Sequence, residues 1–355
     1  MKKSLLALAV SAAAFTGAAS AAEVYSNDGG SVDFYGQLRT EMKFADADDY
    51  NADLSTGSSR IGVDAKYNVM EGFDVLGLVE VGVPAQDDED GNDVEVRRHL
   101  IGFATDYGTV QFGRDWTTSD DLGGTDYSYF FGGTANLYDQ LNGALSESQI
   151  KYSLDLDNWW VKATYGLNDS SNHQDLFEAF VGATYGDLSF HVGGGYNRVH
   201  EFMTTVTDVN DNSFDVGGDL SNTYYEATLV YNLLDNLQVS GTYYGSQLEN
   251  TDNDSKIDQN ALSLGTYWTF VEKTSLYAGY EYVHQKDDDS DASDHGNNAY
   301  LGLEYKFSSW ARVFTEVGYS DGTTLGFTNN QTDVVVGPTE VDSETNFGIG
   351  ARFYW

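Results

Sequence analysis

The chain has 355 residues, a formal net charge of −38 at pH 7 and no cysteine. This charge excludes nucleic acid as a partner, because phosphate binding needs clustered Lys and Arg side chains, and the lack of cysteine excludes a disulfide framework. The sequence holds 38 glycines, 25 tyrosines and 19 phenylalanines but only 2 prolines, a composition that favours strands and tight bends over helices.

The N-terminal segment has the pattern of a secretory signal peptide. Residues 1–10 (MKKSLLALAV) combine a basic start with a short apolar run, and the segment ends in Ala-Ser-Ala at 19–21. The apolar run is shorter than the ~20 residues of a membrane-spanning helix. We therefore expect residues 1–21 to be cleaved off and the mature chain, residues 22–355, to be exported.

Segments with a two-residue period follow along the rest of the chain. In residues 31–44 apolar and polar side chains alternate, over a length near the ~9 to 11 residues that a tilted strand needs to cross a membrane. Residues 345–355 repeat this pattern at the C-terminus. With these two end segments we expect about 16 strands, an even number, as in bacterial single-chain barrels. The other predicted strands are 57–67, 73–84, 96–105, 107–114, 146–155, 158–167, 176–186, 187–197, 222–232, 236–246, 259–270, 274–284, 297–307 and 309–319.

The connections between these segments alternate between short turns and long polar loops. The short ones are 68–72, 186–187 and 271–273, and the long ones are 45–55, 86–93, 200–220, 249–257 and 286–294. This alternation is typical of an outer-membrane barrel with short periplasmic turns and long extracellular loops. The mean hydropathy of −0.41 agrees, because a membrane barrel needs only alternate residues to be apolar.

We therefore predict an all-β fold, a transmembrane antiparallel β-barrel. An unpaired amide in hydrocarbon costs several kcal/mol, so the first and last strands must pair to close the barrel. A soluble β-sandwich or propeller would also show alternation, but it would not need strands of this length or aromatic girdles. The candidate girdle residues are Trp159, Tyr165, Tyr267, Trp268, Tyr305, Phe307, Tyr319 and Trp355.

Four segments resemble the general, non-specific porins of Gram-negative bacteria. Residues 22–36 (AEVYSNDGGSVDFYG) resemble their N-terminus, 59–63 (SRIGV) their second strand, and 107–114 (YGTVQFGR) their fifth strand. Residues 351–355 (ARFYW) resemble their terminal assembly signal, carried here by Phe353 and Trp355, with Trp in place of the usual Phe. The resemblance implies a homotrimer in the outer membrane that forms a water-filled channel and needs no cofactor.

By the same resemblance, residues 115–143 are the third loop, which folds into the barrel and narrows the pore. Within it, residues 125–133 (TDYSYFFGG) are similar to the family segment that carries acidic constriction residues. Asp126 stands where an acid is expected. Phe130 stands where the family commonly has Glu, so one acidic group of the constriction is missing.

The family places a basic cluster on the wall opposite this loop, and Arg60, Arg114 and Lys151 fall at matching positions. Side chains along a strand alternate between its two faces, and we call the face that a residue's position assigns to it its parity. Independently of the resemblance, the parity of Arg60 and Lys151 directs both into the lumen. Arg114 shares its parity with Phe112, so it can point inward only if the strand bends there. The alternative for each cation is a wall charge paired with a neighbouring carboxylate. Other charged residues with inward parity are Asp33, Arg39, Glu41, Lys43, Asp64, Lys66, Glu80, Lys162, Glu178, Glu226, Glu281, Glu304, Lys306, Arg312, Glu316 and Arg352.

Most of the excess negative charge lies in the long loops. Acidic loops around a pore mouth attract cations within about a Debye length, ~8 Å at physiological salt, so we expect a modest cation preference. Alternatively the acids only solvate the loops, or bind divalent cations that bridge to lipopolysaccharide. Residues 208–211 and 252–254 have oxygen ligands but lack the Gly and Glu spacing of a calcium loop, so no metal site is assigned.

Two other function classes were weighed against a channel. A barrel hydrolase is disfavoured, because the sequence has no G-x-S-x-G or H-E-x-x-H motif and its six histidines are scattered. An adhesin or ligand-binding role for the loops would be compatible with a channel. The sequence favours passive diffusion of small hydrophilic solutes and ions, selected by the size of the constriction and its transverse field.

Overall fold

The computed structural model describes residues 22–27, 29–44, 53–83, 94–136, 141, 145–167, 174–207, 213–290, 292–324, 327–330, 333–336 and 339–355. The expected signal peptide, residues 1–21, lies outside the described residues. The described part contains one short helix, α2 (Thr118–Leu122), and no helix there is long and apolar enough to cross a bilayer.

The rest of the described chain is almost entirely β-strand. The strands are β1 (Ala22–Asn27), β2 (Gly30–Phe44), β3 (Asp53–Ser55), β4 (Arg60–Met70), β5 (Phe73–Gly82), β6 (Val96–Thr105), β7 (Gly108–Trp116), β8 (Leu145–Asp155), β9 (Trp159–Gly166), β10 (Gln174–Tyr185), β11 (Leu188–Thr207), β12 (Ser213–Leu234), β13 (Leu237–Asn250), β14 (Ser255–Val271), β15 (Thr274–Asp287), β16 (Ser293–Ser308), β17 (Ala311–Thr324), β18 (Phe327–Asn330), β19 (Asp333–Val336) and β20 (Thr339–Tyr354).

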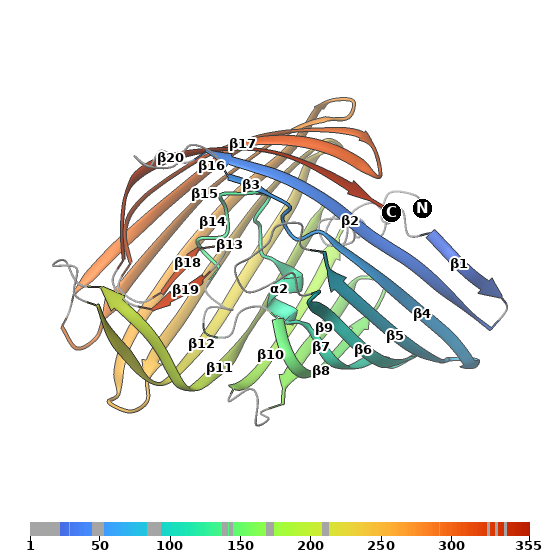
Figure 1. Ribbon diagram of the computed structural model, residues 1–355, viewed down its shortest axis with the longest axis horizontal. Coiled ribbons are helices and arrows are strands. Elements are labelled where there is room, and N and C mark those ends of the chain that lie inside the picture. Colours follow the sequence, from blue (N-terminus) through green and yellow to red (C-terminus); the bar gives the residue numbers. More distant parts are fainter. Residues whose placement is uncertain are drawn as a thin grey trace.

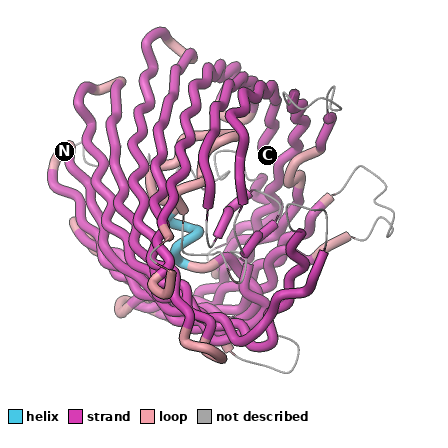
Figure 2. Tube along the Cα trace, turned by 90° about the vertical axis from the view of Figure 1, so that its left-hand side faces the viewer, coloured by secondary structure: helices cyan, strands magenta, loops and turns pink. Residues whose placement is uncertain are grey.

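Sixteen of these described strands form a closed antiparallel ring. Each strand from β4 to β17 pairs with the next, β17 pairs with β20, β20 with β2, and β2 with β4. Figure 1 shows this ring from the side, and Figure 2 shows it turned by 90°. The predicted barrel, its strand number and the pairing of its first and last strands are confirmed. Closure satisfies the backbone amides that an open edge would leave unpaired in hydrocarbon.

The first and last described strands, β1 and β20, meet along one edge of β2. The backbone of Trp355 exchanges hydrogen bonds with Gly36, at 2.9 and 3.1 Å. Two residues before Gly36 on β2, Phe34 lies opposite Ala22 of β1. β20 and β1 therefore pair one after the other with the same edge of β2. The indole of Trp355 covers Gly36, where a Cβ atom would approach the ring to 2.5 Å.

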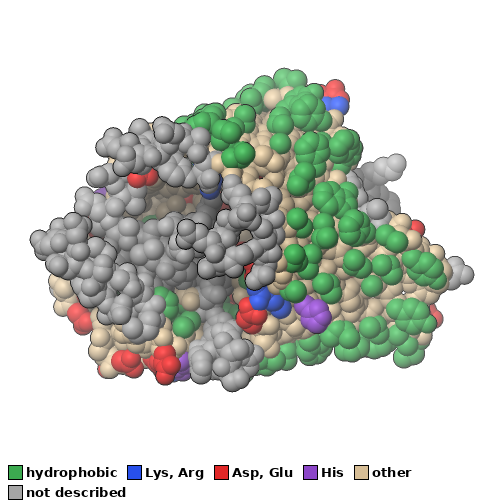
Figure 3. All heavy atoms as spheres, in the orientation of Figure 1, with side chains coloured by type: hydrophobic (Ala, Val, Ile, Leu, Met, Phe, Trp, Pro, Cys, Tyr) green, Lys and Arg blue, Asp and Glu red, His purple; other side chains and the backbone are tan. Residues whose placement is uncertain are grey.

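The strands alternate between a lipid-facing and a lumen-facing side. On β16, Leu301, Leu303 and Phe307 are 47, 42 and 54% exposed, whereas Glu304 on the opposite face is 1% exposed. Hydrophobic side chains cover the outer wall at the right of Figure 3. This two-residue pattern matches an apolar exterior around a polar interior.

Three connections predicted as long loops are shorter than expected, because the flanking strands extend into them. Residues 200–220 belong mostly to β11 and β12, while β13–β14 and β15–β16 are joined through 251–254 and 288–292. These stretches are rich in Asp, Asn, Ser and Thr and do not alternate clearly. Where paired strands continue beyond the membrane, water contacts both faces of the sheet, so neither face needs apolar side chains. Such strands lack the alternation of apolar and polar residues, and hydropathy alone does not reveal them.

Candidate functional site

The link between β7 and β8 folds into the interior of the ring, as the sequence predicted. It opens with α2, whose N-cap Thr117 accepts a hydrogen bond from the Asp120 N–H and which ends at Gly123 in a left-handed conformation, with φ 61°. Figures 1 and 2 both show α2 inside the barrel. We call residues 117–136, the part of this link that the structure describes without a break, the inner loop.

A buried wall carboxylate holds the start of the inner loop. Glu178 of β10 accepts hydrogen bonds from the backbone N–H groups of Thr118 and Ser119, the latter at 3.2 Å. It also accepts from the Tyr224 hydroxyl at 2.7 Å, and its own side chain is fully buried. The first N–H groups of a helix have no partner within the helix, so this carboxylate supplies one.

Two further wall carboxylates hold the end of the inner loop. Glu316 of β17 accepts from the N–H groups of Tyr129 and Phe131, at 2.8 and 2.9 Å. Glu281 of β15 accepts from the N–H groups of residues 133–134, at 3.2 and 3.0 Å. Parity had placed these acids in the lumen, but their role needed the three-dimensional structure, because no sequence pattern links them to a loop more than 140 residues away.

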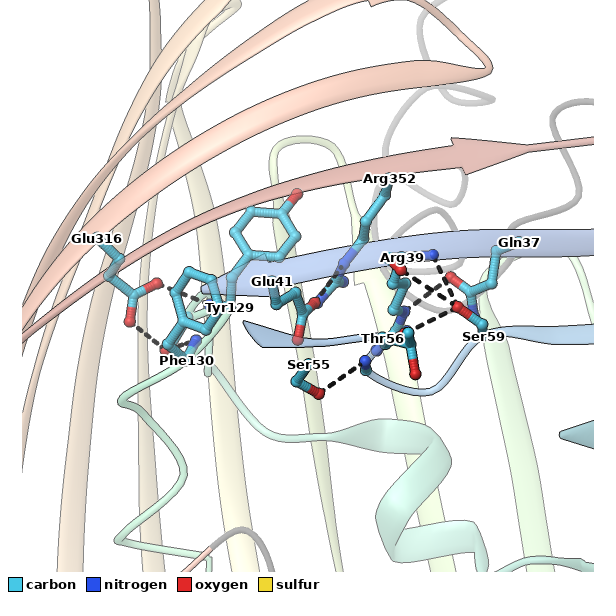
Figure 4. Close-up of polar contacts among 12 residues, drawn as sticks. Gln37, Arg39, Glu41, Ser55, Thr56, Ser59, Tyr129, Phe130, Glu316 and Arg352 are labelled. Carbon is cyan, nitrogen blue, oxygen red and sulfur yellow. Dashed lines mark hydrogen bonds and ion pairs between the residues drawn. The ribbon is translucent and has the colours of Figure 1, made fainter. Parts of the chain in front are cut away.

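Aromatic contacts press the tip of the inner loop against the wall. The Tyr129 ring stacks on Phe314 with centroids 3.9 Å apart, and Phe130, only 2% exposed, lies 5.3 Å from the same ring. Phe130 also covers Gly348 and Gly350, where added Cβ atoms would approach its ring to 2.5 and 3.3 Å. The phenylalanine at the family's acidic position is therefore an anchor in the wall. Figure 4 shows Tyr129 and Phe130 beside Glu316.

Asp126 is turned toward its own loop and the wall. Its Oδ1 accepts the Ser128 N–H at 2.8 Å, and Tyr300, Glu281 and Glu316 lie close to the carboxyl group. Burial, reinforced by the neighbouring Glu281 carboxylate, raises the pKa of Asp126 to about 8. The acid expected in the constriction therefore keeps its proton to a higher pH than an ordinary Asp.

The opposite wall of the lumen carries arginines. Arg60 of β4 and Arg97 of β6 share Glu80, at 3.6 and 3.1 Å. Arg98 forms a bidentate ion pair with Asp115, in which two guanidinium N–H groups donate to the two carboxylate oxygens at 2.5 and 3.2 Å. Sequence-based prediction missed both Arg97 and Arg98. These two residues are adjacent on one strand, so strict alternation permits only one of them to face inward. A register shift between β5 and β6 at Glu80 brings both into contact with lumen carboxylates.

Lys151 and Arg114 have different surroundings from Arg60. Lys151 of β8 is buried at the base of the inner loop, where it donates to the Trp116 carbonyl at 2.9 Å and pairs with Asp121. Arg114 pairs with Glu95, at 2.7 Å, and with Glu147, both of them exposed.

The inward direction of Arg114 required a bend in β7, and a register shift does occur between Gly113 and Asp115. It turns Asp115, 1% exposed, into the lumen, whereas Arg114 stays opposite the outward-facing His99. The structure therefore does not bring Arg114 together with Arg60 and Lys151.

The remaining predicted residues are distributed over the wall. Lys43 lies 5.9 Å from the Phe130 ring, and Lys162 lies 5.2 Å from the Trp160 ring. Phe353 faces outward, 44% exposed, with the Trp310 ring 6.1 Å away. Arg39, Arg312 and Arg352 face the lumen together and are described below.

No group of three or more acidic or histidine side chains in the described ranges is arranged to hold a metal ion. In the candidate segment 252–254, the Asp252 carboxylate instead accepts the backbone N–H of Asp219 at 3.1 Å. The other candidate segment, 208–211, lies outside the described residues.

Comparisons with known proteins agree with this architecture. The profile of the Gram-negative porin family matches residues 7–325. The major outer membrane protein of Pasteurella multocida is 28% identical over 350 residues, covering 90% of this chain and 93% of that protein. In-vitro folded OmpT, an outer membrane protein of Vibrio cholerae, is 46% identical with a TM-score of 0.85, covering 94% of this chain and 100% of that one. A trimer form of the same protein is 47% identical with a TM-score of 0.83, covering 92% of this chain and 100% of that one.

Proposed function

Because the chain belongs to the Gram-negative porin family and forms a channel in the outer membrane, we propose that it is a passive diffusion pore for small hydrophilic solutes and ions. The constriction lies between the inner loop and the arginine-bearing wall of β2, β4, β6 and β20. The observation that carries this proposal is the fixing of the inner loop by Glu178, Glu281 and Glu316. A loop held by buried carboxylates narrows the lumen without a moving part, as passive sieving requires.

The proposed ion preference is weakly cationic and arises at the mouth of the pore. The net charge of −38 lies mainly in the loops, where it raises the local cation concentration. Arg60, Arg97 and Arg98 oppose this preference in the constriction, where the raised pKa of Asp126 lowers its average negative charge. Mouth and constriction therefore act in opposite directions, and the preference stays small.

The test is a planar-bilayer recording with the purified protein. Large ohmic conductance steps with a cation-directed reversal potential across a KCl gradient are expected. An anion-directed reversal would retain the pore but show that the constriction outweighs the mouth. Folded protein that gives no steps would contradict the proposed function and favour a ligand-binding or enzymatic barrel.

We further propose that the chain assembles as a homotrimer through the outer wall of β2 and β4–β7. A trimer form exists for the Vibrio cholerae relative. Here the outer wall has a hollow of about 860 Å³, and exposed Tyr67, Ile101 and Phe112 line it beside Gly77. A Cβ atom added at Gly77 would meet no described atom within 4 Å apart from those of its chain neighbours, so it points into open space. Gly77→Trp should therefore leave the monomer folded and weaken the trimer, which light scattering in detergent measures.

The outward apolar side chains contact outer-membrane lipid, and we propose that acidic loops contact lipopolysaccharide through divalent cations. Residues 84–93, which include four consecutive acids, lie in the undescribed part of the chain. Removal of divalent cations should then weaken lipopolysaccharide retention on the purified protein. We propose no enzymatic activity and no cofactor.

A further inference from the structure

Four cations lie opposite one another on neighbouring strands of the lumen wall. The register places Lys306 of β16 opposite Arg312 of β17. It places Arg352 of β20 between Arg312 and Arg39 of β2, directly opposite both. Opposite side chains on one face of an antiparallel sheet are about 4.5–5.5 Å apart at Cβ, and like charges in such positions are destabilising. We call these four residues the cation row.

Two carboxylates compensate part of this charge. Glu304 lies 3.1 Å from Lys306 and 3.2 Å from Arg312. Glu41 pairs with Arg352 at 2.9 Å. Counted over the described residues, the row holds two more positive than negative charges, so these carboxylates relieve its repulsion only partly.

Arg39 is the member of the row that has no carboxylate partner among the described residues. Its Nε donates to Gln37 Oε1 at 3.1 Å, and no carboxylate in the described part of the chain lies within ion-pair distance of its guanidinium. Gln37 lies opposite Arg60 of β4, which already shares Glu80 with Arg97. Arg39 is therefore a partly exposed lumen cation with a further cation on each side.

The surroundings of Arg39 are rigid. Its backbone N–H donates to Ser59 Oγ at 2.9 Å, which ties β2 to the end of the β3–β4 link. The neighbouring Arg352 guanidinium lies 4.5 Å from the Tyr129 ring and 5.1 Å from the Phe314 ring. Figure 4 shows Arg39 and Arg352 on adjacent strands, with Glu41 and the loop residue Tyr129 beside them. The backbone of Arg39 and the guanidinium of Arg352 are therefore fixed before any solute arrives.

We propose that Arg39, flanked by Arg352 and Arg60, is a subsite for a phosphate-type oxyanion inside the pore. A guanidinium presents a planar fork of N–H donors that matches phosphate oxygens in pairs, and an anion bound there offsets the uncompensated charge of Arg39. This subsite rests on the proposed channel function and adds a solute class to it. The bound ion occupies the lumen beside the inner loop and slows the passage of other ions.

The experiment measures block of the potassium current by phosphate. Wild-type channels are recorded in about 0.1 M KCl, where the Debye length is about 10 Å, and inorganic phosphate is then added. A saturable fall in current is expected. Arg39→Gln should raise the half-blocking concentration by about tenfold or more, since a hydrogen bond to a charged group is lost. Arg39→Lys, which keeps the charge but loses the fork, should give an intermediate value.

Lys256→Gln is the matched control. It removes one cation at the start of β14, where Lys256 pairs with Glu249 at 3.3 Å, and it should leave the phosphate block unchanged. A sugar phosphate is tested separately, so that a free ion and a phosphorylated solute are distinguished by their half-blocking concentrations.

The outcomes separate the subsite from the channel. Normal conductance without phosphate block, or equal block in the wild type and Arg39→Gln, would overturn the subsite and leave the porin function standing. Absence of conductance from folded wild-type protein would overturn both. Loss of conductance in Arg39→Gln alone is resolved by titrating phosphate into the folded variant by calorimetry, where retained wild-type affinity overturns the subsite.

Discussion

The two sides of the lumen use charge in different ways. On the side of β10–β17, Glu178, Glu281 and Glu316 are at most 1% exposed and accept hydrogen bonds from the backbone of the inner loop. On the side of β2–β6, the side chains of Arg60 and Arg98 are 24 and 26% exposed and reach the lumen. The first set fixes the shape of the constriction, and the second set gives it an electrostatic field.

This difference explains why the acidic composition does not by itself predict the pore's selectivity. A carboxylate that accepts two or three N–H bonds is saturated by the loop and contributes little field to passing ions. Arginines paired through one edge of the guanidinium keep donors free for solutes.

Phe130→Glu should be the most damaging of these substitutions. It restores the acid that the family commonly has, but it places a charge against Phe314 and over Gly348 and Gly350. An unpaired buried carboxylate costs about 4 kcal/mol or more, so the free energy of unfolding in urea should fall by this order. Phe130→Leu, which stays apolar, should lose about 1 kcal/mol. A stable Phe130→Glu variant with stronger cation selectivity would show instead that this position faces the pore.

Glu316→Ala should free the tip of the inner loop. It removes the acceptor for the N–H groups of Tyr129 and Phe131 and for the Ser128 hydroxyl. The loss should be on the order of 3 kcal/mol, and single-channel current noise should increase as the loop moves. Glu147→Ala removes an exposed acid paired with Arg114 and should change neither quantity measurably. Unchanged noise in Glu316→Ala would contradict the anchoring role of this carboxylate.

On the arginine side, Arg60→Gln and Arg114→Gln form a matched pair. Arg60 faces the lumen, so its loss should raise the cation-to-anion permeability ratio by about two- to fivefold. Glu80 keeps Arg97 as a partner, which limits the effect on stability. Arg114 pairs with exposed Glu95 and Glu147, so its neutralisation should leave the ratio unchanged. Reversal potentials across a KCl gradient decide between the two positions, and equal shifts would remove the distinction.

The sequence was sufficient for the features that depend on local periodicity. The two-residue period predicted the strands and the direction of Arg60 and Lys151, and the physics of hydrocarbon predicted the pairing of the first and last strands. Parity says which side a residue faces but not its height in the barrel. The level at which Arg39, Arg352 and Arg312 meet therefore had to come from the register. The same holds for the anchoring of the inner loop by Glu281 and Glu316.

The smallest expected effect is a pH dependence of stability and ion selectivity, caused by the titration of Asp126 in the inner loop opposite the arginine side of the lumen. The pKa of Asp126 is raised to about 8, so its carboxyl group gains charge as the pH rises from 6 to 9. The folded state then binds more protons than the unfolded state between the ordinary Asp pKa of about 4 and pH 8, and stability should fall with rising pH through this window.

In the same experiment the cation-to-anion permeability ratio should rise slightly between pH 6 and 9, because a negative charge appears opposite the arginines. Asp126→Asn should abolish both the stability slope and the change in permeability ratio assigned to this group. If the variant retains both, the titrating group lies elsewhere, and Asp126 does not couple the loop side of the lumen to its arginine side.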